Sequence, residues 1–320
     1  MNSDSVEEIL RCPCQRKAGL SVSEHGGYIC NDKNCAHSTE HNRFALCQGK
    51  PVLIGFSVND TVCTREMYDG YKDQLYVRRW KGPFLDVLRK LLYSSETTRS
   101  NADRFIAEIQ NSGNPVRLLV VGSGSKGTDT DRLWANPTIR VTGMDIYPSD
   151  SVDYIADAHD LPFAEDSFEG VWIQAVLEHV IDPNRVVAEI HRVLKPSGIV
   201  YSETPFMQQV HEGAYDFTRF TALGHRALFG NFEAPAIGPL MGPATVLAWS
   251  IKYLVWAISR SRLFSIGIFI PLIALAKLID ALLTERARWD GASATFFLGR
   301  KRAASKFKGR DVIALYRGLQ

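Results

Sequence analysis

The stretch VRLLVVGSGSKG, at residues 116–127, decides the fold of this chain. Six mostly aliphatic residues of the kinds that favour β-strands run directly into a loop with glycines at 122, 124 and 127. Glycines at such a turn let the backbone approach a bound ligand closely and leave amide donors available to it. Because a lone glycine pattern is a weak signal, the neighbouring sequence must decide what the loop binds.

Strand-like and helix-like stretches alternate after this loop. Candidate strands lie at 116–121, 138–144, 153–156, 170–174 and 198–203. The clearest helix, 183–194, has Asp182 as its N-cap, Pro183 at its first position and the sequence KPSG after it. This alternation predicts an α/β fold with a Rossmann-like, doubly wound and mostly parallel sheet, which binds ligands at the carboxyl ends of its strands. A strand at 294–300 is expected to close the sheet as its antiparallel last strand.

The chain divides into three segments by composition. Residues 1–57 are polar and rich in cysteine, with too few apolar positions to fold without help. Residues 58–115 form a helical lead-in, with apolar residues at helical spacing over 83–92 and 102–109. Residues 116–320 form the main domain, which carries an apolar helical insertion at 240–283.

Composition and charge exclude little. The chain is 45% hydrophobic and 22% charged, with a formal net charge of +2, so bulk electrostatics favour neither nucleic acid nor anionic membrane. A basic tail runs from Arg300 to Arg317, with solvated surface as its simplest interpretation. The start, MNSDSVEEIL, has no positive segment followed by an apolar run, which predicts a cytoplasmic location with reduced thiols.

A series of further motifs follows the glycine loop. GMDI (143–146), IADAHDLPF (155–163), DSFEGVWI (166–173), LEHVIDP (177–183) and RVLKPSGIV (192–200) occur in that order. Asp145, the acid of GMDI, would also suit the ribose of a nicotinamide dinucleotide. The whole series, over roughly 116–232, resembles class I S-adenosylmethionine-dependent methyltransferases of the small-molecule type. The resemblance implies an enzyme that transfers a methyl group from that cofactor.

The resemblance also implies a cofactor site. Gly122 and Gly124 would pass near the methionine part, Asp145 would bind the ribose hydroxyls, Asp157 would accept from the adenine amino group, and Gln174 would face the methyl donor. The alternative interpretation is a strand-ending turn with capping acids. The full set of expected cofactor residues is Gly122, Ser123, Gly124, Asp145, Ile146, Asp157, Ala158 and Gln174.

Two positions depart from the family pattern. Val120 stands where the family usually carries an acid, and Lys126 stands where a third glycine is often found. Both would weaken or alter cofactor binding. They leave open a different class of function, that of a non-catalytic cofactor-binding or scaffold protein.

The segment ETPFMQQVHEGAYDFTRF, at 203–220, follows the fifth strand and should overhang the active site. It resembles a stretch of methyltransferases that include some of glycan and lipid biosynthesis. His211 would act as general base if its pKa is near neutral, with Asp216 orienting it and Arg219 holding an anionic substrate group. The structural alternative is an Asp216–Arg219 ion pair, with His211 capping the loop.

The cysteines of the first segment predict a zinc ribbon. Two turns carry Cys12 with Cys14 and Cys30 with Cys35, which would place four thiolates around one tetrahedral Zn²⁺. Because the spacing is unusual, His37 or Cys47 is an alternative ligand, and reduced cysteines without metal are the simpler interpretation. The segment resembles the zinc-ribbon subunits that partner tRNA and release-factor methyltransferases and the ribbon of certain ribosomal RNA methyltransferases, which implies a docking module.

The insertion contains two apolar stretches, 244–258 and 263–276, on either side of Arg260 and Arg262. Lys252 interrupts the first and Pro271 the second, so neither reaches the roughly 20 residues that span a bilayer. The pattern predicts two helices in the membrane interface, or a shallow re-entrant hairpin, with Trp249 and Trp256 at headgroup level. Alternatives are a lid on the domain, a dimer face, or one tilted span through 235–258.

The sequence hypothesis is therefore a zinc-ribbon methyltransferase in the cytoplasm, peripheral to the membrane. Its acceptor would be a small lipophilic or lipid-linked molecule. RNA methylation is the rival enzyme function, based on the ribbon and the basic tail. The sequence leaves the acceptor atom and the oligomeric state open.

Overall fold

The structure is a computed structural model that describes residues 6–56, 61–69, 94–111, 113, 115–125, 127, 129–302 and 308–320. The helix expected at 83–92 and the side chain of Lys126 lie outside the described residues. The remaining expected elements of the main domain can be compared with the structure directly.

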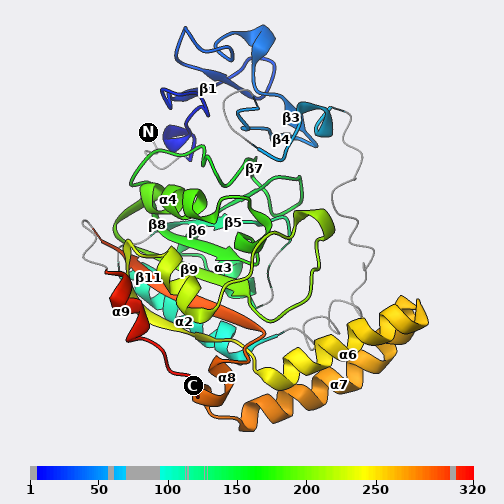
Figure 1. Ribbon diagram of the computed structural model, residues 1–320. Helices are drawn as coiled ribbons and strands as arrows, with labels where there is room; N and C mark the ends of the chain where they lie inside the picture. The colour runs from blue at the N-terminus through cyan, green and yellow to red at the C-terminus, as the bar shows by residue number, and fades with distance from the viewer. Residues whose placement is uncertain are drawn as a thin grey trace.

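A seven-stranded sheet lies at the centre of the molecule, in the order β10-β11-β9-β8-β5-β6-β7 (Figure 1). Strands β5 to β9 run parallel, and β11 runs antiparallel to both of its neighbours. The expected Rossmann-like sheet with an antiparallel last strand is thus confirmed. The strands are β5 (Val116–Val121), β6 (Ile139–Asp145), β7 (Tyr154–Ile155), β8 (Phe168–Gln174), β9 (Leu194–Pro205), β10 (Phe232–Pro239) and β11 (Ala294–Lys301).

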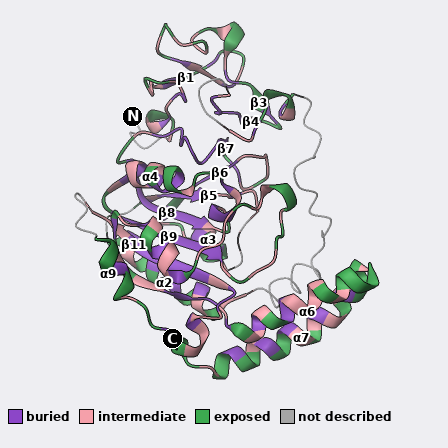
Figure 2. Cartoon of the chain, viewed as in Figure 1, coloured by how far each residue is buried: buried purple, intermediate pink, exposed green. Residues whose placement is uncertain are grey.

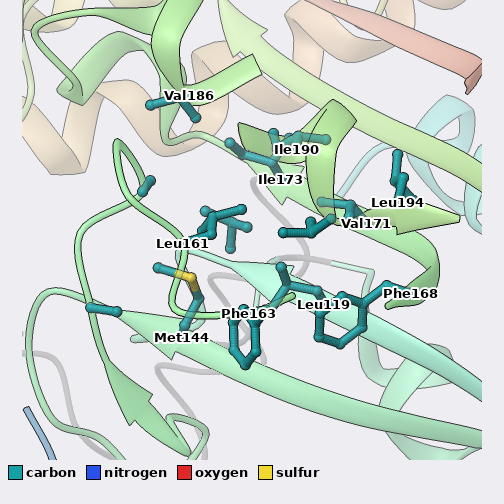
Figure 3. Close-up of a cluster of buried hydrophobic side chains, with 14 of the residues drawn as sticks. Leu119, Met144, Leu161, Phe163, Phe168, Val171, Ile173, Val186, Ile190 and Leu194 are labelled. Carbon is teal, nitrogen blue, oxygen red and sulfur yellow. The ribbon is translucent and has the colours of Figure 1, made fainter. Parts of the chain in front are cut away.

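Helices cover both faces of the sheet. On one face, α4 (Pro183–Val193) packs through Val186 and Ile190 onto Val171 and Ile173 of β8, as Figure 3 shows. Its N-cap, Asp182, accepts hydrogen bonds from the backbone amides of Asn184 and Arg185, as the sequence predicts. On the other face lies α2 (Glu96–Gln110). Shorter helices are α3 (Asp131–Ala135), α5 (Ala222–Leu228), α8 (Glu285–Trp289) and α9 (Gly309–Ile313), with 3-10 turns η1 (Val6–Ile9), η2 (Glu40–Asn42), η3 (Arg65–Met67), η4 (Leu177–His179) and η5 (Gly213–Tyr215).

The cysteine-rich segment folds into two small hairpins that dock on the β7 edge of the sheet. The hairpins are β1 (Leu20–Val22) with β2 (Tyr28–Cys30), and β3 (Leu46–Cys47) with β4 (Lys50–Pro51). Val52 pairs in parallel with Ile155 of β7, and the Leu53 amide donates to the Ile155 carbonyl over 2.7 Å. The segment therefore covers an edge whose backbone groups would otherwise lack strand partners.

The apolar insertion forms two antiparallel helices, α6 (Pro243–Ser259) and α7 (Arg262–Leu282), which project from the domain (Figure 1). The expectation that Pro271 interrupts the second stretch is wrong: α7 continues through it, and its 21 residues are long and apolar enough to cross a membrane. Phe269 and Ile273 pack against α6 on either side of this proline and hold both halves in one helix. The expected position of Trp249 at headgroup level is also wrong, because its side chain is buried between the two helices.

The first residues of the basic tail are part of the sheet. Arg300 pairs with Glu108, Lys301 with Asp166 and Arg302 with Glu233. These three ion pairs partly neutralise the start of the basic tail, while Lys306 lies outside the described residues.

Candidate cofactor and acceptor site

The glycine loop after β5 is closely packed. Gly122 has φ +78°, and a Cβ built on it would lie 2.1 Å from Val176 Cγ2. The Gly122 and Ser123 amides both donate to the Met144 carbonyl over 2.9 Å, which ties the loop to the end of β6. Only glycine fits at position 122, because any side chain would meet both an unfavourable backbone conformation and Val176.

Asp145 ends β6 beside this loop. Its Oδ2 accepts from the Gly124 amide over 2.7 Å, and its Oδ1 accepts from the Ile146 amide over 2.7 Å. A Cβ on Gly124 would lie 2.2 Å from Tyr147 Cε2, so a larger residue here would displace the Tyr147 ring. The two segments that the sequence assigns to the cofactor thus meet, with the carboxylate held in one orientation.

Asp157 lies one strand further, after β7, and is buried next to the equally buried Ala158. Its Oδ1 accepts from the His159 amide over 2.9 Å and contacts the His159 ring over 2.6 Å. Burial favours the neutral acid, but the hydrogen bonds from His159 and Thr61 outweigh it and lower the pKa of Asp157 below its ordinary value. The carboxylate is therefore charged at neutral pH and able to accept from an amino group.

The lead-in segment closes this part of the site, which sequence reasoning did not anticipate. The Tyr68 hydroxyl donates to the Ile146 carbonyl over 2.7 Å, and Tyr68 is buried. No periodicity signals this contact, because Tyr68 lies far from Ile146 in the sequence and within irregular chain.

Gln174, at the end of β8, is part of a buried polar network. Its Nε2 donates to Glu203 Oε2 over 2.6 Å, and its Oε1 would lie 2.1 Å from a Cβ on Gly127. Glu203 also accepts from the hydroxyls of Thr98 and Tyr201, and its burial raises the pKa of its carboxyl. Gln174 thus packs over the glycine loop, and Glu203 and Thr98 are neighbours of the site to which no role was assigned from the sequence.

The loop after β9 carries the expected acceptor residues. Asp216 is paired with the Arg219 guanidinium and accepts from the His211 amide over 2.9 Å. Burial opposes ionisation, but these partners hold the pKa of Asp216 at about 2. His211 Nδ1 lies 3.3 Å from Asp216 Oδ2, and burial lowers the pKa of His211. The structural ion pair is present, and the same carboxylate also faces the histidine.

Two further residues, Glu178 and His179, lie against His211 and were not assigned a role from the sequence. The Glu178 side chain is completely buried, and burial raises its pKa to about 8. Its Oε1 lies 3.5 Å from His179 Nε2 and 3.7 Å from His211 Nε2. The available signal was an acid and a histidine between the apolar residues Leu177 and Val180, in the LEHV segment.

The four predicted cysteine ligands gather at one point of the N-terminal segment. The Sγ atoms of Cys12, Cys14, Cys30 and Cys35 all lie within 4.8 Å of one another. The alternatives lie elsewhere: His37 Nδ1 contacts the Asn42 carbonyl over 2.8 Å, and Cys47 packs with Ile54. Four thiols at this separation match the donor set of a closed tetrahedral zinc site.

The strand order, with its antiparallel last strand, and the glycine loop beside an acid-terminated strand define the class I methyltransferase domain. The methyltransferase domain family matches residues 119–202. The resemblance expected from the sequence is thereby confirmed, and the chain carries a domain of the class I S-adenosylmethionine-dependent methyltransferase type.

Relatives and solved structures are similar over parts of the chain. A ubiquinone/menaquinone biosynthesis C-methyltransferase of Desulfotalea psychrophila is 29% identical over 42% of this chain and 58% of its own length. A demethylmenaquinone methyltransferase of Clavibacter sepedonicus is 46% identical over 21% of this chain and 29% of its own. A putative sarcosine dimethylglycine methyltransferase structure from Galdieria sulphuraria has a TM-score of 0.43 and 14% identity, covering 64% of this chain and 85% of that one. The alignments thus span less than two thirds of either curated relative.

Proposed function

We propose that the chain is an S-adenosylmethionine-dependent methyltransferase that acts on a lipophilic or lipid-linked acceptor at a membrane surface. The observation that carries the proposal is the Gly124–Asp145 hydrogen bond, because it fixes a carboxylate beside a loop in which position 122 accepts no side chain. The match to the methyltransferase domain and the quinone-pathway names of two relatives support the same conclusion.

The residues present suit the cofactor. We assign the ribose hydroxyls to Asp145 and the adenine amino group to Asp157, a role that its buried and charged carboxylate supports. We assign the methionine part to the backbone of the loop at Gly122 and Gly124, which packs closely against Val176 and Tyr147. The cofactor supplies an activated methyl group, so the chain has to position the acceptor and assist the loss of its proton.

We place the acceptor against the loop that carries His211, with Asp216 as the residue that orients this histidine. The hairpin of α6 and α7 borders the same loop: Tyr253 donates to the Val210 carbonyl over 2.8 Å, and Gln209 donates to Ser250 Oγ over 3.1 Å. A molecule that reaches the hairpin from a lipid phase would therefore arrive next to His211.

The hairpin surface supports membrane contact. Much of the hairpin is exposed, whereas the sheet is buried (Figure 2), and many of the exposed hairpin side chains are large and apolar. Exposed apolar side chains gathered on one pair of helices are typical of a site of interaction with a partner or a membrane. The exposed apolar residues are Leu247, Leu254, Trp256, Ile258, Leu263, Phe264, Leu275, Leu278, Ile279 and Leu282.

We propose that the hairpin lies in the membrane interface and does not span the bilayer. With 17 residues, α6 is about 26 Å long, shorter than the roughly 30 Å hydrocarbon core, and it is packed along α7. Arg260 lies in the turn between the helices, and Arg262 begins α7 and lies over the Trp256 ring. Arginine and tryptophan favour the headgroup region, so this end would remain at the surface. The cytoplasmic face is the expected side.

We further propose that Cys12, Cys14, Cys30 and Cys35 bind one Zn²⁺ that stabilises the N-terminal segment. Their mutual distances fit one ion, and the segment has few apolar residues of its own. An RNA acceptor has less support, because the ion pairs of Arg300, Lys301 and Arg302 reduce the positive surface that would bind phosphates.

Methyl-labelled cofactor tests the proposal. The full chain is incubated with it and with either liposomes that contain a quinol lacking the ring methyl group, or total tRNA and ribosomal RNA. We expect label in the organic phase, and its loss in Asp145→Asn. Label confined to RNA would contradict the proposed acceptor, and absence of cofactor binding would contradict the enzyme function itself.

A further inference from the structure

A second cluster of metal-binding side chains lies at the carboxyl ends of β8 and β9, apart from the four cysteines. One carboxylate oxygen of Glu178 and one ring nitrogen each of His179 and His211 all lie within 4.8 Å of one another. Glu178 and His179 come from the 3-10 turn after β8, and His211 comes from the loop after β9. Val176, two residues before Glu178, contacts Gly122, so the cluster borders the glycine loop.

The Glu178 carboxylate is the most informative member of the cluster. Its side chain has 0% exposure, and among the described residues its Oε1 has no hydrogen-bond partner. Its other oxygen accepts from Thr204 Oγ1 over 3.4 Å. The two histidine nitrogens at 3.5 and 3.7 Å are too far away for hydrogen bonds to Oε1. A buried polar atom without a partner is costly, and a bound cation between these three atoms would remove that cost.

The outer contacts of both histidines prepare them as ligands. His179 Nδ1 lies 2.7 Å from the Tyr215 carbonyl, which can only accept, so this nitrogen carries the proton. His211 Nδ1 faces Asp216 Oδ2 and the Gln209 carbonyl, which likewise act as acceptors. Both Nε2 atoms therefore present lone pairs toward Glu178. Metal-binding histidines usually make this second hydrogen bond to a carbonyl or carboxylate.

From this geometry we propose that Glu178, His179 and His211 bind a divalent first-row transition metal ion on the acceptor side of the site. Two imidazoles and one carboxylate suit Zn²⁺, Fe²⁺, Mn²⁺ or Co²⁺ and leave coordination positions open. If the proposed methyltransferase function holds, an open position would bind an oxygen of the acceptor, which favours acceptors with a hydroxyl next to the methylated atom. His211 then acts on the acceptor as a metal ligand and not as a free base.

Cobalt is a suitable probe, because its absorption distinguishes the two sites. The metal-free full chain first receives one equivalent of Zn²⁺, which the four thiolates bind in preference to the imidazoles and carboxylate, and is then titrated with Co²⁺. We expect one further equivalent to bind, with d–d bands but without the thiolate charge-transfer band. His211→Gln and His179→Gln should each weaken this binding by about tenfold or more, because even a change in the outer hydrogen-bond partners of metal ligands weakens metal binding by that amount. His191→Gln, a histidine on α4 outside the cluster, should bind as the unaltered chain does.

Circular dichroism and calorimetric binding of S-adenosylmethionine are measured on the same samples. The His211 side chain is partly exposed and lies in a loop, so His211→Gln is expected to fold. A chain that binds S-adenosylmethionine but no Co²⁺ beyond the thiolate site would overturn the metal proposal and leave the proposed function standing. A chain that binds the further Co²⁺ but does not bind S-adenosylmethionine would support the metal site and contradict the proposed methyltransferase function. Equal Co²⁺ affinity in folded His211→Gln would also overturn the metal proposal.

Discussion

The backbone amide of Gly124 donates a 2.7 Å hydrogen bond to Oδ2 of Asp145, twenty-one residues further along the chain. This contact joins the end of β5 to the end of β6. It orients the carboxylate before any ligand arrives, and such pre-organisation reduces the free energy lost on binding. The proposed cofactor site therefore depends on backbone geometry as much as on the acid.

Gly122→Ala should weaken cofactor binding by about tenfold or more, because a left-handed conformation costs a non-glycine residue about 1–2 kcal/mol. The new methyl group would also meet Val176. Calorimetric titration with S-adenosylmethionine measures the effect. Gly267→Ala on α7, where a Cβ meets open space, is the matched control and should bind normally. Equal affinity of both variants would contradict the assigned role of the loop.

Flotation with anionic liposomes tests the hairpin. The full chain should float, and Leu263→Glu with Leu282→Glu should remain in the dense fraction, because each exposed leucine contributes about 1.5–3 kcal/mol when buried in lipid. These leucines are 81% and 86% exposed, so their replacement should leave the fold intact. Ile313→Glu on α9, also an exposed position, serves as the control and should float. If the unaltered chain stays dense, the hairpin is a lid or a subunit interface.

Metal analysis of the purified chain tests the ribbon. We expect a tightly held Zn²⁺ that is lost in Cys30→Ser, together with faster proteolysis within residues 6–56, because the metal stabilises a segment with a small core. Cys47→Ser changes a buried thiol outside the four-cysteine group and should keep its zinc. Full zinc content in Cys30→Ser would mean that other ligands hold the ion.

His225 predicts a specific pH dependence of stability. It is buried between Ser202 and Thr295, and burial lowers its pKa to about 3. The unfolded chain takes up this proton below its ordinary pKa of about 6.5, so the contribution is present above that pH and is lost as the pH falls toward 3. The slope should approach about 1.4 kcal/mol per pH unit.

Urea unfolding at pH 7.5 and 5.5 measures this slope. His225→Gln should be less stable at pH 7.5, because the new side chain fits the site less well, but its stability should change less between the two pH values. His41→Gln, at an exposed histidine, should retain the full change. An unchanged slope in His225→Gln would show that the proton is bound elsewhere.

Much of the sheet could be predicted from the sequence, because its strands are buried aliphatic runs separated by glycine and proline. The run 116–121 coincides with β5, and the capping residues Asp182 and Pro183 marked the start of α4. Strand β10 was missed, since Pro235 and Pro239 interrupt its pattern. Such prolines are tolerated on an edge strand, where one side needs no partner.

The proposed acceptor side was harder to predict, because it depends on contacts between distant segments. Glu178 and His211 meet only because β8 and β9 are neighbours and the loop after β9 folds back over the turn after β8. Local periodicity contains no information about such a meeting. The continuity of α7 through Pro271 was misjudged for a similar reason, since packing against α6 outweighs the local preference.

Cofactor binding by the full chain tests the central claim most directly. Calorimetry should show that the unaltered chain binds S-adenosylmethionine. Asp145→Asn should bind it at least about tenfold more weakly, because a charged hydrogen-bond acceptor contributes more than a neutral one. Asp150→Asn, a change at an exposed residue, should bind it as the unaltered chain does. If the chain does not bind the cofactor, or if Asp145→Asn binds it equally well, the site assigned to Gly124 and Asp145 is wrong.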